Sequence, residues 1–174
     1  MTDNIKPQFT FAIPTFHRNE FLRQALKSAI QQKTTTHYEI LIIDNDPSST
    51  FADELSTFVG INTRAHLRYI RNSENIGMFG NWNKCLQEAT ADWMTILSDD
   101  DAVHHNFLET ILPFCNADFS AVAVGKQKFS NNASTDLGSL MECELATPTV
   151  FKKIYKPVFN IFNPIGTPAG LSFN

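Results

Sequence analysis

A short apolar segment that ends in three consecutive aspartates places the strongest constraint on how this chain folds. Residues 93–98 read Trp-Met-Thr-Ile-Leu-Ser, and Asp99, Asp100 and Asp101 follow directly. The apolar residues are typical of a buried strand in a parallel sheet, and open α/β sheets bind ligands outside the carboxyl ends of their strands. Carboxylates at that place are suitable ligands for Mg²⁺ or Mn²⁺, which prefer oxygen. The alternative is a solvated acidic turn that caps the next helix.

Strand-like and helix-like segments alternate through the first two-thirds of the chain. Residues 39–43 read Glu-Ile-Leu-Ile-Ile, a nearly continuous apolar run that is typical of a strand covered on both faces. Residues 19–32 carry apolar side chains at helical spacing, and Asn19 is a suitable N-cap. The same criteria predict further strands at 9–13, 67–70, 93–98 and 120–129, and further helices near 51–59, 77–89 and 107–115. This alternation predicts an α/β fold, with a mostly parallel sheet and helices on both of its faces.

Several local details follow from the same patterns. We expect Pro14 to end the first strand, and Gly77 to supply a permissive backbone conformation at the start of its helix. Val59 and Phe79 are expected to face the core from their helices. Thr147 and Pro148 are expected to begin a helix that reaches about Tyr155.

The pattern changes after residue 129, and we therefore divide the chain into residues 1–129 and 130–174. Residues 130–138 have the composition of a loop, and Leu171-Ser172-Phe173 looks like the beginning of a strand. We interpret the chain as the front part of a longer protein. The tail is too apolar for an exposed segment, so we expect it either to fold back or to cover a second copy, and we favour a homo-oligomer.

Composition excludes several classes of protein. Of the 174 residues, 43% are hydrophobic and 18% are charged, as in globular proteins. The net charge of −4 argues against nucleic acid as a partner. The three cysteines lack the spacing of metal ligands and fit a reducing compartment. Because the sequence has neither a signal peptide nor an apolar run long enough for a transmembrane segment, we expect a cytoplasmic protein.

Several segments resemble, in order, the motifs of the family 2 glycosyltransferases. Residues 11–18, Phe-Ala-Ile-Pro-Thr-Phe-His-Arg, are similar to an opening strand and loop usually written I-P-T-Y-N-R. Residues 39–44 resemble the second strand with its terminal Asp, residues 71–77 followed by 81–83 resemble the N-x-G segment and its helix, and residues 97–101 match the D-x-D region. Residues 164–173 look like the sequence that enters the acceptor half.

The resemblance implies the nucleotide-sugar-binding part of a GT-A fold, which is Rossmann-like, truncated before the acceptor-binding half. Residues 1–129 would then be the donor domain, and 130–174 the incomplete start of the acceptor part. The implied activity is metal-dependent transfer, with inversion, of a sugar from a uridine diphosphate sugar to a hydroxyl of a saccharide or lipid-linked acceptor. The implied cofactor is Mn²⁺ or Mg²⁺, and the implied location is the cytoplasm, including the inner face of the membrane.

The resemblance also assigns donor-binding residues. Pro14 and Thr15 would line the base pocket with Asp44, whose carboxylate would accept the N3–H of uracil. Arg71 would approach the base or the diphosphate, and Asp99 would lie near the ribose or the metal. Simpler interpretations stay open, because Asp44 also suits a helix cap and Arg71 a surface position. The family often has D-D-G-S after its second strand, whereas residues 44–48 here read Asp-Asn-Asp-Pro-Ser, so this turn departs from the family pattern.

In the acidic cluster, the resemblance assigns the metal to Asp99, Asp100 and Asp101, and it leaves open which of the last two is the direct ligand. Three other polar residues near the motifs are not assigned to the site. Arg18 is interpreted as a side chain that extends from its loop, and Asn81 and Asn83 as residues on the solvent-exposed face of a helix. No catalytic base is assigned, because the family's base lies in the acceptor half, beyond residue 174.

Two other interpretations compete with the transferase. The first is a nucleotide-sugar-binding module without catalysis. The second is another α/β protein with an acidic pocket, such as a response-regulator receiver domain or a metal-dependent phosphatase. The second is disfavoured, because those proteins need an acidic residue after their first strand and residues 11–16 contain none.

Overall fold

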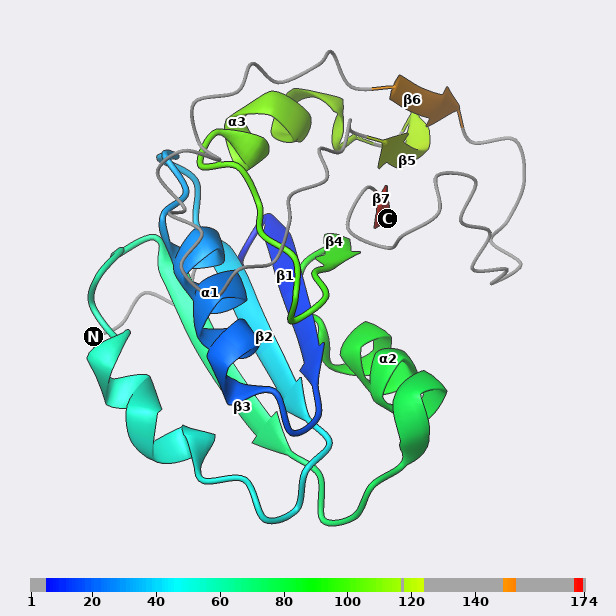
Figure 1. Ribbon diagram of the computed structural model, residues 1–174. Helices are drawn as coiled ribbons and strands as arrows, with labels where there is room; N and C mark the ends of the chain where they lie inside the picture. The colour runs from blue at the N-terminus through cyan, green and yellow to red at the C-terminus, as the bar shows by residue number, and fades with distance from the viewer. Residues whose placement is uncertain (1–5, 117, 124–148, 153–170, 174) are drawn as a thin grey trace.

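A parallel sheet forms the centre of the molecule (Figure 1). The computed structural model describes residues 6–116, 118–123, 149–152 and 171–173. Strands β1 (Phe9–Thr15), β2 (Tyr38–Asp44), β3 (Ala65–Arg71) and β4 (Trp93–Ile96) are parallel and lie in the order β3-β2-β1-β4. Every residue of β1, β2 and β4 is buried, as expected for strands covered on both faces. The predicted α/β fold with a mostly parallel sheet is confirmed.

Three short antiparallel strands extend the sheet beyond β4. They are β7 (Leu171–Phe173), β5 (Phe119–Ala123) and β6 (Thr149–Lys152), in the order β4-β7-β5-β6. The strand predicted at 171–173 is therefore confirmed, whereas the helix predicted to begin at Thr147 is wrong for residues 149–152. Pairing of Val150 with Val122 overrides the helix-start signal, because β-branched residues suit a strand. The boundary at 129/130 and most of the apolar tail lie outside the described residues.

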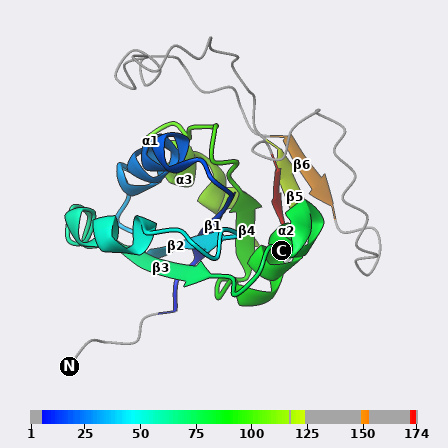
Figure 2. The ribbon, with the colours of Figure 1, turned by 60° about the horizontal axis from the view of Figure 1, so that its bottom comes forward.

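Helices cover the two faces of the sheet unequally (Figure 2). On one face, α1 (Asn19–Ile30), η1 (Phe51–Thr57), α3 (Phe107–Ile111) and η2 (Leu112–Phe114) share a large hydrophobic core with the strands. On the other face, α2 (Gly77–Glu88) packs on Ala12, Leu41 and Ile43. Phe9, Phe11 and Ile13 of β1 enter the first core and Ala12 the second, as the two-residue period of a strand requires. None of the described helices has the length and apolar character needed to cross a membrane.

Three local predictions were wrong. The first strand continues through Pro14, which lies opposite Ile43, because only one backbone donor is lost and the Thr15 carbonyl still accepts from the Asn45 N–H at 2.9 Å. Val59 is 70% exposed, since η1 ends at Thr57 and Phe58 already takes the buried position. Phe79 is 68% exposed, because α2 buries Asn81 and Cys85 instead.

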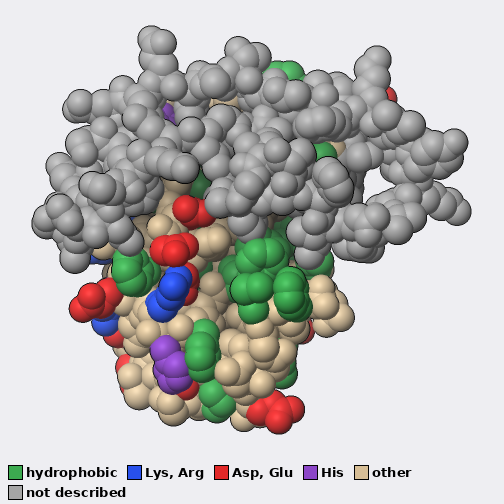
Figure 3. Space-filling model, turned by 45° about the vertical axis from the view of Figure 1, so that its right-hand side comes forward, with side chains coloured by type: hydrophobic (Ala, Val, Ile, Leu, Met, Phe, Trp, Pro, Cys, Tyr) green, Lys and Arg blue, Asp and Glu red, His purple; other side chains and the backbone are tan. Residues whose placement is uncertain are grey.

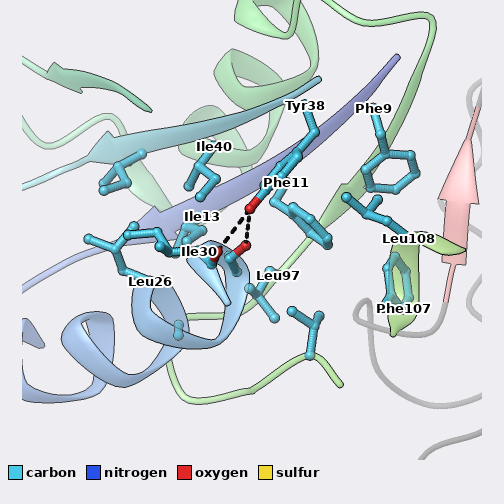
Figure 4. Close-up of a cluster of buried hydrophobic side chains, with 14 of the residues drawn as sticks. Phe9, Phe11, Ile13, Leu26, Ile30, Tyr38, Ile40, Leu97, Phe107 and Leu108 are labelled. Atoms are coloured by element: carbon cyan, nitrogen blue, oxygen red, sulfur yellow. Dashed lines mark hydrogen bonds between the residues drawn. The ribbon is translucent and has the colours of Figure 1, made fainter. Parts of the chain in front are cut away.

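The larger core contains a polar anchor at the carboxyl end of α1 (Figure 4). The Tyr38 hydroxyl donates to the carbonyls of Ala29 and Ile30, at 3.0 and 3.1 Å, and the side chain of Asn62 donates to the Tyr38 hydroxyl. The last carbonyls of a helix have no partner within the helix. Tyr38 therefore lets α1 end inside an apolar core, between rings such as Phe11.

Replacing Tyr38 with Phe tests this anchor. We expect Tyr38→Phe to lower the free energy of unfolding by about 1–2 kcal/mol, because the Ala29 carbonyl would stay buried without its donor. Urea denaturation followed by tryptophan fluorescence measures the change. The control is Thr57→Val, which removes an exposed hydroxyl that donates to the Glu54 carbonyl and should change stability by less than about 0.5 kcal/mol. Equal effects of the two substitutions would contradict the anchoring role.

Candidate functional site

A cavity of about 480 Å³ opens where the carboxyl ends of β1, β2 and β4 meet the beginning of α2. The chain moves from β1 to β2 and β3 on one side and then places β4 on the other side of β1, and such a switch in strand order is where α/β sheets bind ligands. Charged and hydrophobic side chains lie next to one another on the face shown in Figure 3. The lining residues come from four segments: Pro14, Thr15, Phe16, Arg18, Asn45, Asn75, Gly77, Met78, Asn81, Trp82, Ser98, Asp99 and Asp100.

The acidic cluster supplies one wall of the cavity. Asp99 is 6% exposed, and its two oxygens accept hydrogen bonds from the Thr15 hydroxyl at 2.9 Å and from the Arg18 guanidinium at 3.2 Å. The same Arg18 nitrogen, Nη1, donates to Asp100 at 3.0 Å. Asp101 is absent from the cavity lining, and its backbone N–H donates to the Ser98 carbonyl.

Burial dominates the electrostatics of Asp99. It raises the pKa of the carboxyl above its ordinary value, although the hydrogen bonds from Thr15 and Arg18 act in the opposite direction. The hydrogen bond and the charge of Asp99 in turn raise the pKa of Arg18. Thr15 and Arg18 thus compensate a carboxylate that folding brings out of water.

Two predicted donor-binding residues lie outside this cavity lining. Asp44 is 1% exposed, and its oxygens accept from the Tyr69 hydroxyl at 2.7 Å and from the Asp46 backbone N–H at 3.0 Å. Burial, assisted by the charge of Asp44, raises the pKa of Tyr69 to about 12, so this hydroxyl remains a donor. Arg71 donates to the Ser49 carbonyl at 2.6 Å. The contacts predicted for both residues with the donor stay predictions.

A network of asparagine side chains forms a second wall of the cavity, which Asn45, Asn75 and Asn81 line. Asn45 donates to Asn75 at 2.7 Å and accepts from Asn72 at 2.9 Å, and Asn72 also donates to Asn81 at 3.0 Å. Asn81 in turn donates to the Ile43 carbonyl of β2 at 3.0 Å. The network therefore ties the beginning of α2 to the carboxyl end of β2.

Two residues beside the same cavity, His17 and Gly77, have a positive φ angle. His17 has a φ of 56°, and its Nδ1 lies 2.8 Å from Asp46 Oδ2, so the loop after β1 is tied to the loop after β2. The Phe16 ring contacts the His17 ring and is half-exposed at the cavity. Gly77 has a φ of 76°, which confirms its predicted role in backbone geometry.

The comparison with known families decides what kind of chain this is. The model of the family described as "Glycosyl transferase family 2" matches residues 10–174. This chain belongs to glycosyl transferase family 2.

Individual relatives and solved structures agree with that membership. A curated relative, the GalNAc(5)-diNAcBac-PP-undecaprenol beta-1,3-glucosyltransferase of Campylobacter jejuni, is 28% identical over 117 residues, or 67% of this chain and 37% of the relative. The mannosyltransferase PcManGT from Pyrobaculum calidifontis, solved with GDP-Man and Mn²⁺, gives a TM-score of 0.58 at 17% identity, over 71% of this chain and 37% of that one. S. aureus TarS 1-349 with UDP-GlcNAc gives 0.57 at 18% identity, over 66% and 33%.

These comparisons show the fold of the chain and the share of its relatives' length that it covers. The structural likeness shows that this family 2 chain has the GT-A fold, as the sequence motifs imply. The chain spans about a third of the length of these relatives, at 37% and 33% of the two solved chains. It corresponds to the N-terminal part of a family 2 glycosyltransferase.

The site residues assigned from the family 2 motifs are thus brought together in part. Pro14, Thr15, Asp99 and Asp100 line one cavity, whereas Asp44, Arg71 and Asp101 do not. Arg18 was interpreted only as a side chain that extends from its loop, yet it pairs with two aspartates. The interpretation of Asn81 as a solvent-face residue was wrong, and the helical spacing of Asn81 and Cys85 is the signal that identifies its buried position.

The role of the asparagine network can be tested at Asn81, with a matched control, Asn83, on the same helix. We expect Asn81→Ala to lower the free energy of unfolding by about 1–3 kcal/mol, because the buried Ile43 carbonyl and an Asn72 N–H would lose their partner. Asn83→Ala, at an exposed position two residues later, should stay within about 0.5 kcal/mol of the original protein. Chemical denaturation measures both variants. A similar small effect at both positions would show that the network does not hold α2.

Proposed function

We propose that this chain forms the donor-binding part of a metal-dependent glycosyltransferase that uses a uridine diphosphate sugar and inverts the anomeric centre. One observation carries the proposal: Thr15, Arg18, Asp99 and Asp100 converge on one cavity at the strand-order switch of a family 2 chain. The names of the relatives support glycosyl transfer, and the UDP-GlcNAc complex of TarS supports a nucleotide-sugar donor.

The residues present fit a hard divalent cation. Asp99 and Asp100 offer carboxylate oxygens that already share one positive group, the Arg18 guanidinium. Within the described part of the chain, no cluster of three or more His, Cys, Asp or Glu side chains is arranged to hold a metal ion. We propose that Asp99 and Asp100 would hold Mn²⁺ or Mg²⁺ together with phosphate oxygens of the donor, and the ligand role assigned to Asp101 stays a prediction. When bound, such a metal neutralises the diphosphate and stabilises the charge of the leaving group.

The remaining lining residues suit the nucleoside part of a donor. The Phe16 ring offers an apolar face to a base, and the amides of Asn45 and Asn75 offer polar groups beside it. Asp44 is proposed as the acceptor of the uracil N3–H, which would require a base to reach a carboxylate oxygen that already accepts one hydrogen bond. Each carboxylate oxygen has a second lone pair available.

Turnover requires groups that these residues do not supply. An inverting transfer needs a base that deprotonates the acceptor hydroxyl, and we assign no residue of this chain to that role. A saccharide or lipid-linked acceptor, self-association and a cytoplasmic location stay predictions. The chain by itself is accordingly proposed to bind the donor, and the base is expected beyond residue 174.

Calorimetric titration of nucleotides tests the metal-dependent part of the proposal. We expect UDP to bind at least about tenfold more tightly with Mn²⁺ than with EDTA, a difference of about 1.4 kcal/mol. Asp100→Asn should remove this difference, because it removes one carboxylate from the cavity. Asp92→Asn, an exposed aspartate that pairs with Lys6, should retain it. Equal UDP affinity with and without metal in the original chain would contradict the site assignment.

A comparison of nucleotides tests the assignment of Asp44. With Mn²⁺ present, UDP should bind more tightly than GDP, dTDP or CDP. Asp44→Asn should reduce the preference for UDP over GDP by about tenfold, the equivalent of one hydrogen bond to a charged group. Thermal unfolding must show that the variant is folded, because Asp44 also accepts from Tyr69. An unchanged preference in a folded variant would show that Asp44 does not read the base.

A further inference from the structure

Arg18 lies where two carboxylates of the proposed metal site meet. A single nitrogen, Nη1, lies 3.2 Å from Asp99 Oδ1 and 3.0 Å from Asp100 Oδ2. We propose that Arg18 takes the place of the divalent cation between Asp99 and Asp100 until that cation displaces it. Arg18 is thus a positioning residue that sets the affinity of the site for the cation. The inference rests on the proposed donor-binding function and adds a regulated step to it.

The two sides of this contact differ in how firmly they are held. Asp99 is buried and is also bound by the Thr15 hydroxyl, so its carboxylate is fixed before any ligand arrives. The Arg18 side chain is 51% exposed. Within the described part of the chain, it donates hydrogen bonds to the carboxylates of Asp99 and Asp100. An ion pair that is half in water contributes little stability. The guanidinium is therefore the partner that can move.

Charge balance makes the two cations competitors. Without Arg18, folding would leave the buried Asp99 carboxylate, among the described residues, with only the Thr15 hydroxyl to offset its charge, beside a second carboxylate, Asp100. With both Arg18 and a divalent cation on the same oxygens, like charges would repel. The site therefore holds one positive group at a time, and the binding of the cation includes the cost of releasing Arg18.

A bound diphosphate would lower the cost of releasing Arg18 from the two carboxylates. Arg18 lines the same cavity as Asp99 and Asp100, so a guanidinium released from the carboxylates remains beside the proposed donor site. Guanidinium groups form strong, charge-assisted hydrogen bonds with phosphate oxygens. The displaced Arg18 thereby gains a new partner only when a diphosphate is present. Binding of the cation and binding of the diphosphate are then coupled through Arg18, and each strengthens the other.

Arg23 provides a matched control for this proposal. It lies on α1, the helix that begins directly after Arg18, and two of its guanidinium nitrogens donate to the Glu54 carboxylate at 2.7 and 2.8 Å. Arg23 is absent from the cavity lining. Replacing either arginine with glutamine removes one positive charge and the ion pairs that this arginine forms, but only Arg18→Gln frees Asp99 and Asp100.

The first experiment titrates Mn²⁺ into the nucleotide-free chain. Arg18→Gln should bind Mn²⁺ about two- to fivefold more tightly than the original chain, which corresponds to the small free energy of a half-exposed ion pair that no longer has to be broken. Arg23→Gln should match the original chain, and Arg18→Lys should lie close to it, because a lysine restores the positive charge. Unchanged or weaker Mn²⁺ binding by a folded Arg18→Gln would overturn the inference.

The second experiment measures how UDP changes the affinity for Mn²⁺. In the original chain and in Arg23→Gln, UDP should raise the Mn²⁺ affinity by a larger factor than in Arg18→Gln, because only the former gain a guanidinium–phosphate contact. Equal factors in all three would overturn the coupling through Arg18. These failures are distinct from failure of the proposed function, which would appear as an absence of metal-dependent UDP binding in the original chain.

Discussion

The pairing of β1 with β2 on one side and β4 on the other is the constraint on which the rest of this structure depends. Because the three strands are parallel, their carboxyl ends meet at one edge of the sheet, and the loops after Thr15, Asp44 and Ile96 begin at neighbouring positions. All residues of these strands are buried, so a slip in register would move apolar side chains to the wrong face. The hydrogen bond from the Thr15 hydroxyl to Asp99 then links the carboxyl end of β1 to the loop that follows β4.

The cavity that results has two walls of different chemistry. On one wall, a buried carboxylate accepts hydrogen bonds from a hydroxyl and from a half-exposed guanidinium, and we propose that a divalent cation can replace the guanidinium. On the other wall, neutral asparagine amides satisfy one another and the backbone of β2. Among the described residues, no buried side-chain nitrogen or oxygen lacks a hydrogen-bond partner. The amide wall is therefore suited to hold its shape, while the charged wall is suited to respond to a ligand.

Much of the fold could be predicted because it depends on local patterns. The apolar strand at 39–43 and the helical spacing at 19–32 identify β2 and α1 without knowledge of their partners. The predictions that failed concern which face of a helix is buried and where an element ends. Phe79 and Asn81 lie two positions apart on α2, and the local pattern of apolar residues assigned Phe79 to the core although Asn81 is the buried residue. The buried amide is favoured there only because Asn72 and the Ile43 carbonyl lie opposite, and both belong to other strands and loops.

The sequence by itself determined the parallel α/β core, the family motifs and the acidic cluster at the end of a buried strand, because these depend on spacing along the chain. Only the tertiary structure decided which motif residues share a cavity. Arg18 meets Asp99 across 81 residues of sequence, and Asp44 turns to Tyr69 across 25 residues. The direction of such side chains depends on the donors and acceptors that folding brings close, and on the free energy of leaving a buried charge or carbonyl unpaired. No local pattern of residues contains that information.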